Sequence, residues 1–140
     1  MFIKQLSVFV ENKAGRLEPI IKSLGAGGIN IRALSIADTT DFGILRIIVD
    51  DDQKAREILR ENGVISKVTE VIAVYIDDRS GGLAAVLDIV GAAGVNIEYM
   101  YAFLGRKEGK ALMVLKADDE AAAEKALKEG GIEIADPENL

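Results

Sequence analysis

Two segments of the sequence, ENKAGRL at 11–17 and DDRSGGL at 77–83, have residue types suited to binding a small charged molecule. Each combines polar side chains with glycine and leads into apolar residues at helical spacing, which predicts a turn at a helix N-terminus. Such a turn brings unpaired backbone N–H groups and the positive end of a helix dipole together, where a carboxylate binds well. Glycine leaves room there for a ligand or relieves strain in the turn.

An asparagine follows each turn at the start of the next predicted strand. Asn30 and Asn96 offer an amide oxygen to an ammonium group and an amide NH₂ to a carboxylate. We expect each asparagine to lie beside the turn of its own copy, so that both parts hold a small zwitterion or acid. The candidate ligand-binding residues are Asn12, Ala14, Gly15, Arg16, Leu17, Asn30 and Ile31 in the first copy and Asp78, Ser80, Gly81, Gly82, Leu83, Asn96 and Ile97 in the second.

Each candidate also has a purely structural interpretation. The two glycines would also fit turns that bind no ligand. The side chains of the two asparagines would also fit hydrogen bonds to backbone groups of a loop. Asn12 and Asp78 are residue types that often cap helices. Arg16 has Gly82 as its counterpart, so we expect any difference in binding between the copies to arise at this position.

These segments belong to an internal repeat that covers the chain. An offset of 66 residues aligns Gly15 with Gly81, and an offset of 68 aligns AREILRENGV at 55–64 with AEKALKEGGI at 123–132. The two extra residues of the second copy fall most simply in a hairpin at 105–110.

Each copy predicts the element order βαββαβ. Alternating apolar residues predict the strands, spacings of three and four predict the helices, and the acidic run at 50–52 suits the start of a helix. The fold class is therefore α+β, with two tandem ferredoxin-like βαββαβ units, 1–70 and 71–140, each an antiparallel sheet with its helices on one face. The predicted strands lie at 4–10, 29–37, 42–50 (joined to the previous strand through DTTD at 38–41), 64–71, 71–77, 95–104, 110–117 and 132–135. The first predicted helix begins at 17 and is ended by the glycines at 25, 27 and 28; the second is opened by the acidic run at 50–52; the others span 82–92 and 119–129.

Aromatic residues alternate along one predicted strand of the second copy. Tyr99, Tyr101 and Phe103 share one face, and Tyr75 lies on a neighbouring strand. Aromatic residues on strands usually pack, so we interpret this stripe as sheet core or a dimer surface rather than a ligand site. Met100 points to the other face and is predicted to be core.

The composition narrows the classes of function. The chain has no cysteine and no histidine, which removes thiol nucleophiles, the commonest general base and most zinc chemistry. We therefore predict no catalytic residue, no metal and no cofactor. A net charge of −6 disfavours nucleic-acid binding, and the absence of a leader or a long apolar run predicts a cytoplasmic protein with no membrane association.

At Gly15-Arg16-Leu17 and Gly28-Ile29-Asn30-Ile31, and again at 81–83 and 94–97, the chain resembles the ACT domain, a small regulatory module of amino-acid metabolism. The shared pattern is a D-x-x-G-x-L turn into a helix, followed by G-x-N-I at the next strand. Asn12 replaces the more usual Asp in the first copy, whereas Asp78 fits the pattern. The resemblance covers essentially the whole chain and implies a free amino acid as ligand, held at both charged ends.

The leading functional hypothesis is an amino-acid-binding regulatory or sensor protein, acting through ligand-linked dimerisation or docking on a partner biosynthetic enzyme. A homodimer is expected because small sheets leave edges that pairing would cover. One alternative is a regulatory subunit resembling the small subunit of acetolactate synthase. A small ferredoxin-like enzyme is an alternative of another class, but it would have to work without histidine, cysteine or a convergent carboxylate pair.

Overall fold

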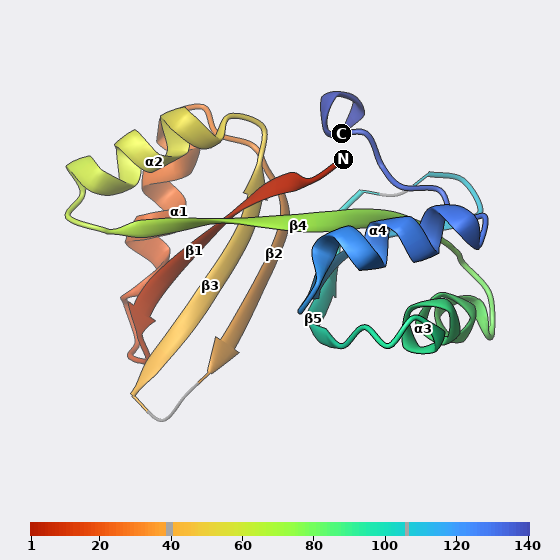
Figure 1. The fold of residues 1–140 in the computed structure, drawn as a ribbon. Helices are drawn as coiled ribbons and strands as arrows, with labels where there is room; N and C mark the ends of the chain where they lie inside the picture. Colours follow the sequence, from red (N-terminus) through yellow and green to blue (C-terminus); the bar gives the residue numbers. More distant parts are fainter. Residues whose placement is uncertain (39–40, 106) are drawn as a thin grey trace. The chain divides into compact units, whose positions relative to one another are not determined.

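The computed structural model describes residues 1–38, 41–105 and 107–140. Thr39 and Thr40 of the predicted loop at 38–41, and Arg106 of the predicted hairpin at 105–110, lie outside the described residues. The elements, drawn in Figure 1, are β1 (Ile3–Glu11), α1 (Leu17–Ala26), β2 (Ile31–Asp38), β3 (Phe42–Val49), α2 (Asp52–Glu61), β4 (Ser66–Asp77), α3 (Gly82–Ala92), β5 (Ile97–Ala102), β6 (Lys110–Ala117), α4 (Glu120–Glu129) and the short 3₁₀ helix η1 (Pro137–Asn139).

The chain divides into two compact units, each with the βαββαβ-like pattern of a ferredoxin-like fold. The first unit is Lys4–Thr69, and the second comprises Met1–Ile3 with Glu70–Leu140. The strands predicted at 64–71 and 71–77 form the single strand β4, because no turn-forming residue interrupts the apolar run at the junction. The tandem α+β fold predicted from the sequence is confirmed.

The first unit has the strand order β2-β3-β1-β4, and the pairings of β1 and β2 with β3 are antiparallel. Glu11 at the end of β1 pairs with Phe42, and Asp38 at the end of β2 pairs with Gly43. We call this end of the sheet the turn end, because β1 passes into the β1–α1 turn there. Ile31 at the start of β2 pairs with Val49, the last residue of β3, and therefore lies at the opposite end of the sheet, which we call the far end.

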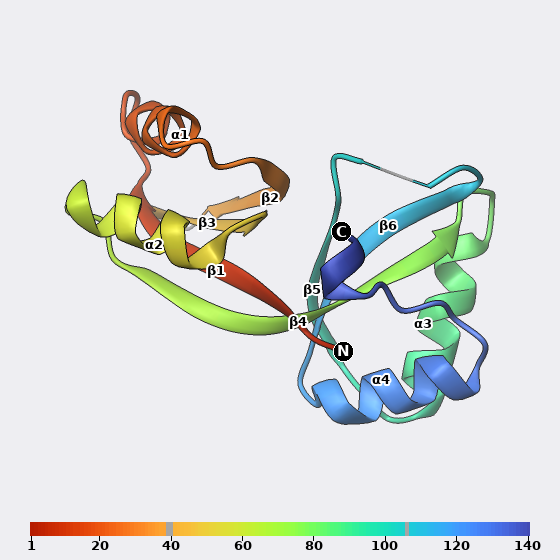
Figure 2. The same ribbon diagram turned by 90° about the horizontal axis from the view of Figure 1, so that it is seen from above.

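The core of the first unit lies between one face of its sheet and both of its helices. Alternate residues of β1 and β3, including Leu6 and Ile47, are fully buried against α1 and α2. Leu24 and Leu59 supply the facing helix positions, and burying each such side chain contributes about 1.5–3 kcal/mol. Figure 2 shows α1 and α2 on the same side of β1 and β3, which confirms the prediction of helices on one face.

The second unit repeats this arrangement with the strand order β4-β6-β5. Its core cluster joins β4 and β6 to α3 and α4, and Met100 packs against it as predicted. The strand predicted at 132–135 is reduced to an isolated bridge between Val74 and Ile134. The short run ends there because Pro137, which has no N–H to donate, begins η1 shortly afterwards.

Two residues of the predicted aromatic stripe, Tyr99 and Tyr101, lie on β5 and contact each other. The rings of Tyr99 and Tyr101 are stacked, with centroids 6.4 Å apart and planes 20° apart. Tyr101 is buried, which fits a packing role rather than a ligand site for this pair.

Candidate functional site

The β1–α1 turn and the β4–α3 turn are anchored by equivalent hydrogen bonds. In the first unit the N–H of Asn12 donates to the carbonyl of Asp41 at 3.0 Å. In the second unit the N–H of Asp78 donates to the carbonyl of Gly109 at 3.1 Å. Each turn is thereby tied to the loop before the neighbouring strand, so the repeat in sequence is a repeat in backbone structure.

A glycine with left-handed backbone stands in each turn. The φ angle is 80° at Gly15 and 85° at Gly81, a conformation that costs a residue with a Cβ about 1–2 kcal/mol. A Cβ at either position would meet no atom within 4 Å, so the backbone conformation, not crowding, requires glycine. The backbone N–H groups of Ala14 and Gly15, and of Ser80 and Gly81, have no acceptor among the described residues. They are free to bind an anion.

The capping interpretation of Asn12 and Asp78 was wrong. The N-cap residues are Arg16 for α1 and Gly81 for α3, and neither helix has a side-chain capping hydrogen bond. The turn separates Asn12 and Asp78 from the first helical residues, so their side chains lie before the cap position rather than at it.

The two turns differ where Arg16 has Gly82 as its counterpart. A Cβ on Gly82 would lie 2.0 Å from the carbonyl oxygen of Asp77, so this backbone approach accepts only glycine. The N–H of Gly82 donates to the carbonyl of Arg79 at 3.0 Å. Arg16 is exposed, and residues 14–15 before it form a turn as residues 80–81 do before Gly82. The turns therefore differ in the side chain at this position, an exposed guanidinium in the first and none in the second.

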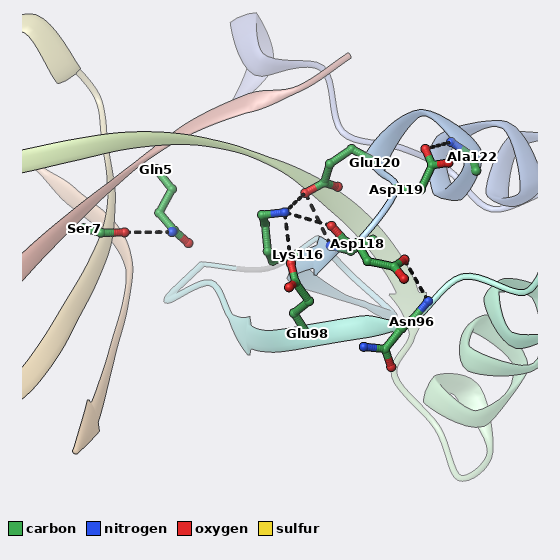
Figure 3. A network of polar contacts seen from close by, with 10 residues as sticks. Gln5, Ser7, Asn96, Glu98, Lys116, Asp118, Asp119, Glu120 and Ala122 are labelled. Carbon is green, nitrogen blue, oxygen red and sulfur yellow. Dashed lines mark hydrogen bonds and ion pairs between the residues drawn. The ribbon is translucent and has the colours of Figure 1, made fainter. Parts of the chain in front are cut away.

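The strand-opening asparagines do not lie beside the turns of their own units, contrary to expectation. The N–H of Asn30 donates to the Asp50 carboxylate at 3.0 Å, and the N–H of Asp50 donates back to the Asn30 carbonyl at 3.2 Å. Asn96 and Asp118 repeat this exchange, with both distances 3.0 Å. Both pairs lie at the far end of the sheet, because the helix after each turn returns the chain to that end. In Figure 3 the backbone N–H of Asn96 faces Asp118.

The apolar candidates of the two copies differ in exposure. Leu17 packs against the core of the first unit, whereas Leu83 is 41% exposed at the start of α3. Ile31 and Ile97, the first residues of β2 and β5, pack against the cores of their units at the far end. Of the apolar candidates, Leu17 is thus both partly buried and adjacent to a turn.

A hollow of about 220 Å³ opens beside the β1–α1 turn, at the turn end of the first sheet. Sequence analysis identified two of its lining residues, Asn12 and Leu17, and missed the strand positions. Gly43 adds no side chain to this hollow; a Cβ there would lie in van der Waals contact with the Cγ2 of Ile36, 3.4 Å away. The lining consists of Val10, Glu11, Asn12, Lys13, Leu17, Ile36, Gly43 and Leu45.

The repeat contains a signal that could have identified the hollow. Aligning the copies places Ala111 opposite Gly43 and Ala102 opposite Ile36. The first unit thus lacks a side chain on β3 close to where β2 carries the larger Ile36. That exchange marks a wall whose shape differs between the copies.

Charged side chains flank both turns. In the first unit the Nζ of Lys13 lies 3.5 Å from the carboxylate of Glu11. In the second, Asp77 forms an ion pair with Lys110 and lies 3.5 Å from Nε of Arg79. The hydrogen bond from Lys110 and its positive charge, with a smaller contribution from Arg79, lower the pKa of Asp77 below its usual value of 3.8.

A second charged group lies at the far end of the second unit, where Lys116 stands between Glu98 and Glu120 (Figure 3). Its Nζ is 3.2 Å from Glu98 and 3.3 Å from Glu120. Burial opposes the charge on Lys116, but the two carboxylates outweigh it and raise the Lys116 pKa. Burial also raises the pKa of Glu120 above its usual value of 4.5, because its Oε2 is buried without a hydrogen bond from any described residue. The hydrogen bond from the Ala117 N–H and the charge of Lys116 lower this pKa, but burial outweighs them. The first unit has Ile48 in place of Lys116.

Neither metal chemistry nor a membrane span is indicated by the described residues. Across residues 1–38, 41–105 and 107–140, no group of three acidic, cysteine or histidine side chains could hold a metal ion. Within the same ranges, no helix is both long and apolar enough to cross a bilayer.

Comparison with known proteins places this arrangement in a family. A family model described as an ACT domain pair matches residues 1–140. The chain belongs to this family. No curated protein matches this ACT domain pair.

Two solved structures have folds similar to that of this chain. Protein BT0572 from Bacteroides thetaiotaomicron is 38% identical with a TM-score of 0.91, over 98% of this chain and 94% of that one. The regulatory subunit of aspartate kinase from Thermus thermophilus, in a ligand-free form, is 18% identical with a TM-score of 0.63, over 91% of each chain. Membership of the ACT family indicates a regulatory rather than a catalytic protein.

Proposed function

We propose that this ACT domain pair is a regulatory sensor that binds a free amino acid at the β1–α1 turn of its first unit. The observation that carries the proposal is the turn itself: the N–H groups of Ala14 and Gly15 have no acceptor among the described residues, and Asn12 and Leu17 on either side line a hollow of about 220 Å³. Gly15 lines a second hollow, of about 370 Å³. Amino-acid binding is the property that the ACT resemblance implies. The equivalent β4–α3 turn, whose Ser80 and Gly81 N–H groups also have no acceptor among the described residues, is a second candidate.

The two charged ends of the ligand have separate partners in this proposal. The carboxylate accepts hydrogen bonds from the N–H groups of Ala14 and Gly15 near the start of α1. The ammonium group meets the carboxylate of Glu11 and the amide oxygen of Asn12, which line the hollow. Both ends are then held by charge-assisted hydrogen bonds.

The ligand side chain enters the apolar part of the hollow. Leu17, Ile36 and Leu45 line it, so an aliphatic side chain suits it better than a polar one. The side chain of Ile36 is 50% exposed without a ligand, and a bound ligand that covers it removes apolar surface from water.

Signalling occurs through a second copy of the chain or through a partner enzyme. Ile36 and Phe42, each 50% exposed, lie at the turn end of the first sheet, where β2 is an edge strand. A second copy that covers this edge would bury apolar surface next to the ligand. Ligand binding then stabilises the dimer by a coupling free energy between the two events. Sedimentation that is unchanged by a bound amino acid would contradict this and leave docking on a biosynthetic enzyme as the mode of action.

The proposal is tested by a thermal-shift screen of the twenty amino acids, because a ligand that binds only the folded state raises its stability. We expect at least one aliphatic amino acid to raise the melting temperature. Gly43→Ala should weaken that ligand about tenfold or more by filling the hollow. Ala111→Gly, the matched change in the second unit, should leave binding intact. Silence across the panel at millimolar concentration would overturn the proposal.

Asn30→Ala distinguishes two versions of the site. Asn30 lies at the far end of the first sheet, so its loss should leave binding at the β1–α1 turn unchanged. A strong loss of binding would overturn the single-unit site and place the ligand where two copies of the chain meet. Asn12→Ala, at the turn itself, should weaken binding in either case.

A further inference from the structure

Two arginine side chains lie next to each other on the exposed face of α2. Arg56 and Arg60 are one helical turn apart and both are exposed. Neither forms an ion pair with any residue that the structure describes, although the chain carries a net charge of −6. Like charges at this spacing destabilise a helix, so the pair is not explained by helix stability.

In the second unit the equivalent two positions carry opposite charges that neutralise each other. At the offset of 68 residues, Glu124 stands in place of Arg56 and Lys128 in place of Arg60. Lys128 Nζ lies 3.3 Å from the Glu124 carboxylate, the favourable i,i+4 arrangement. Arginine at position 56 therefore removes the partner of residue 60 and adds a second positive charge.

The two arginines border a hollow of about 310 Å³ between α2 and the start of β4. Its lining adds the hydroxyl of Ser66 and an exposed apolar wall, since Ile65 is 89% exposed. One carboxylate, that of Glu57, also lines it. The full lining is Gln53, Arg56, Glu57, Arg60, Val64, Ile65 and Ser66.

We propose that this hollow binds a small phosphate-bearing molecule with an apolar or planar body, the class that includes nucleotides. Two guanidinium groups match phosphate oxygens as paired donors, and the Ser66 hydroxyl adds a third donor. Ile65 provides a surface against which the body of the ligand packs. A nucleic-acid backbone requires a row of cations, which two arginines do not supply.

This site is separate from the amino-acid site of the proposed function. It is built on α2 and the beginning of β4, whereas the amino-acid site is built on the β1–α1 turn with β2 and β3. The two sites share no lining residue. The chain would thus respond to two different small molecules, and either site can be removed without the other.

The test is calorimetric titration of the full chain with pyrophosphate and with adenosine monophosphate at low salt. Both should bind, and binding should weaken as salt is added because the arginines are exposed. Arg60→Gln should weaken binding about tenfold or more, the loss of a charge-assisted hydrogen bond. Glu57→Gln should tighten binding, since it removes the one carboxylate of the lining.

Arg56→Glu separates binding from folding. It recreates the arrangement of Glu124 with Lys128, so the melting temperature should stay the same or rise while phosphate binding is lost. Lys128→Gln, the matched change in the second unit, should leave phosphate binding unchanged. An amino acid that binds at the turn should still raise the melting temperature of both variants.

Two results would overturn the phosphate site. One is the absence of binding by the wild-type chain at millimolar pyrophosphate and low salt. The other is wild-type affinity in the double variant Arg56→Gln with Arg60→Gln. In the first case, binding of an acidic peptide would assign the two arginines to contact with a protein.

Discussion

The β1–α1 turn and the β4–α3 turn share their anchors and differ in what they leave open. Both are tied to the neighbouring loop by an N–H to carbonyl bond, and both contain a glycine with φ near 80°. In the second turn, the backbone at Gly82 lies so close to the Asp77 carbonyl that no side chain fits, whereas the first turn carries the exposed side chain of Arg16. Duplication has kept the bonds that hold each turn and changed the group that a ligand would meet.

The helices α2 and α4 also share their buried residues and differ in exposed charge. α4 pairs its Glu124 with Lys128, whereas α2 carries Arg56 and Arg60 and so leaves both cations available. The apolar positions of the two helices remain alike, since Leu59 and Leu127 are both fully buried. Packing constrains the inner face of each helix, and the outer face is free to acquire a binding role.

The largest expected effect comes from exchanging the residues that distinguish the turns. Gly82→Arg should lower the free energy of unfolding by about 3 kcal/mol or more, because its Cβ would overlap the Asp77 carbonyl oxygen. Arg16→Gly should cost about 1 kcal/mol or less, since Arg16 is exposed. Urea denaturation measures both. Similar small losses would mean that the two turns are interchangeable.

The next effect tests a feature that the units share. Asp51 and Asp119 are the N-caps of α2 and α4, and each accepts a backbone N–H at 3.0 Å. Asp51→Ala and Asp119→Ala should each cost about 1 kcal/mol, the usual value of such a cap. A clear loss in chemical denaturation for only one variant would show that the caps are not equivalent.

Lys116→Ile places the residue of the first unit into the second and should cost about 1 kcal/mol or less at neutral pH. The pKa of Glu120, already raised by burial, should rise further once Lys116 is gone. A raised carboxyl pKa means that stability falls as the pH rises through it. The loss should therefore be greatest above the Glu120 pKa and shrink once Glu120 is protonated. Carboxyl NMR titration measures this, and an unchanged Glu120 pKa would contradict it.

The smallest expected effect concerns the ion pair beside the second turn. Lys110→Met should return the pKa of Asp77 toward 3.8, since Lys110 is the main cause of its low value. A lowered carboxyl pKa stabilises the fold above the unfolded-state pKa, and this is lost as the pH falls through the folded-state value, below 3.8. Lys107→Met, which breaks the pair with Glu133, should leave the Asp77 titration unchanged. Equal shifts in both variants would rule out a specific effect of Lys110.

The sequence by itself determined the elements and the positions of both turns. The spacing of apolar residues predicted a helix at 82–92, and α3 is Gly82–Ala92. The acidic run at 50–52 predicted the start of α2, and Asp51 is its N-cap. These features depend on bonds between near neighbours, so local residue types suffice to predict them.

Only the tertiary structure decided which of these residues meet. Asn30 was expected beside the turn of its own unit but lies at the far end of the sheet, held by Asp50. The hollow beside that turn is completed instead by Ile36 and Gly43, which come from β2 and β3. Such meetings depend on strand direction and on pairing between distant segments. Residue spacing along the chain reports neither of these.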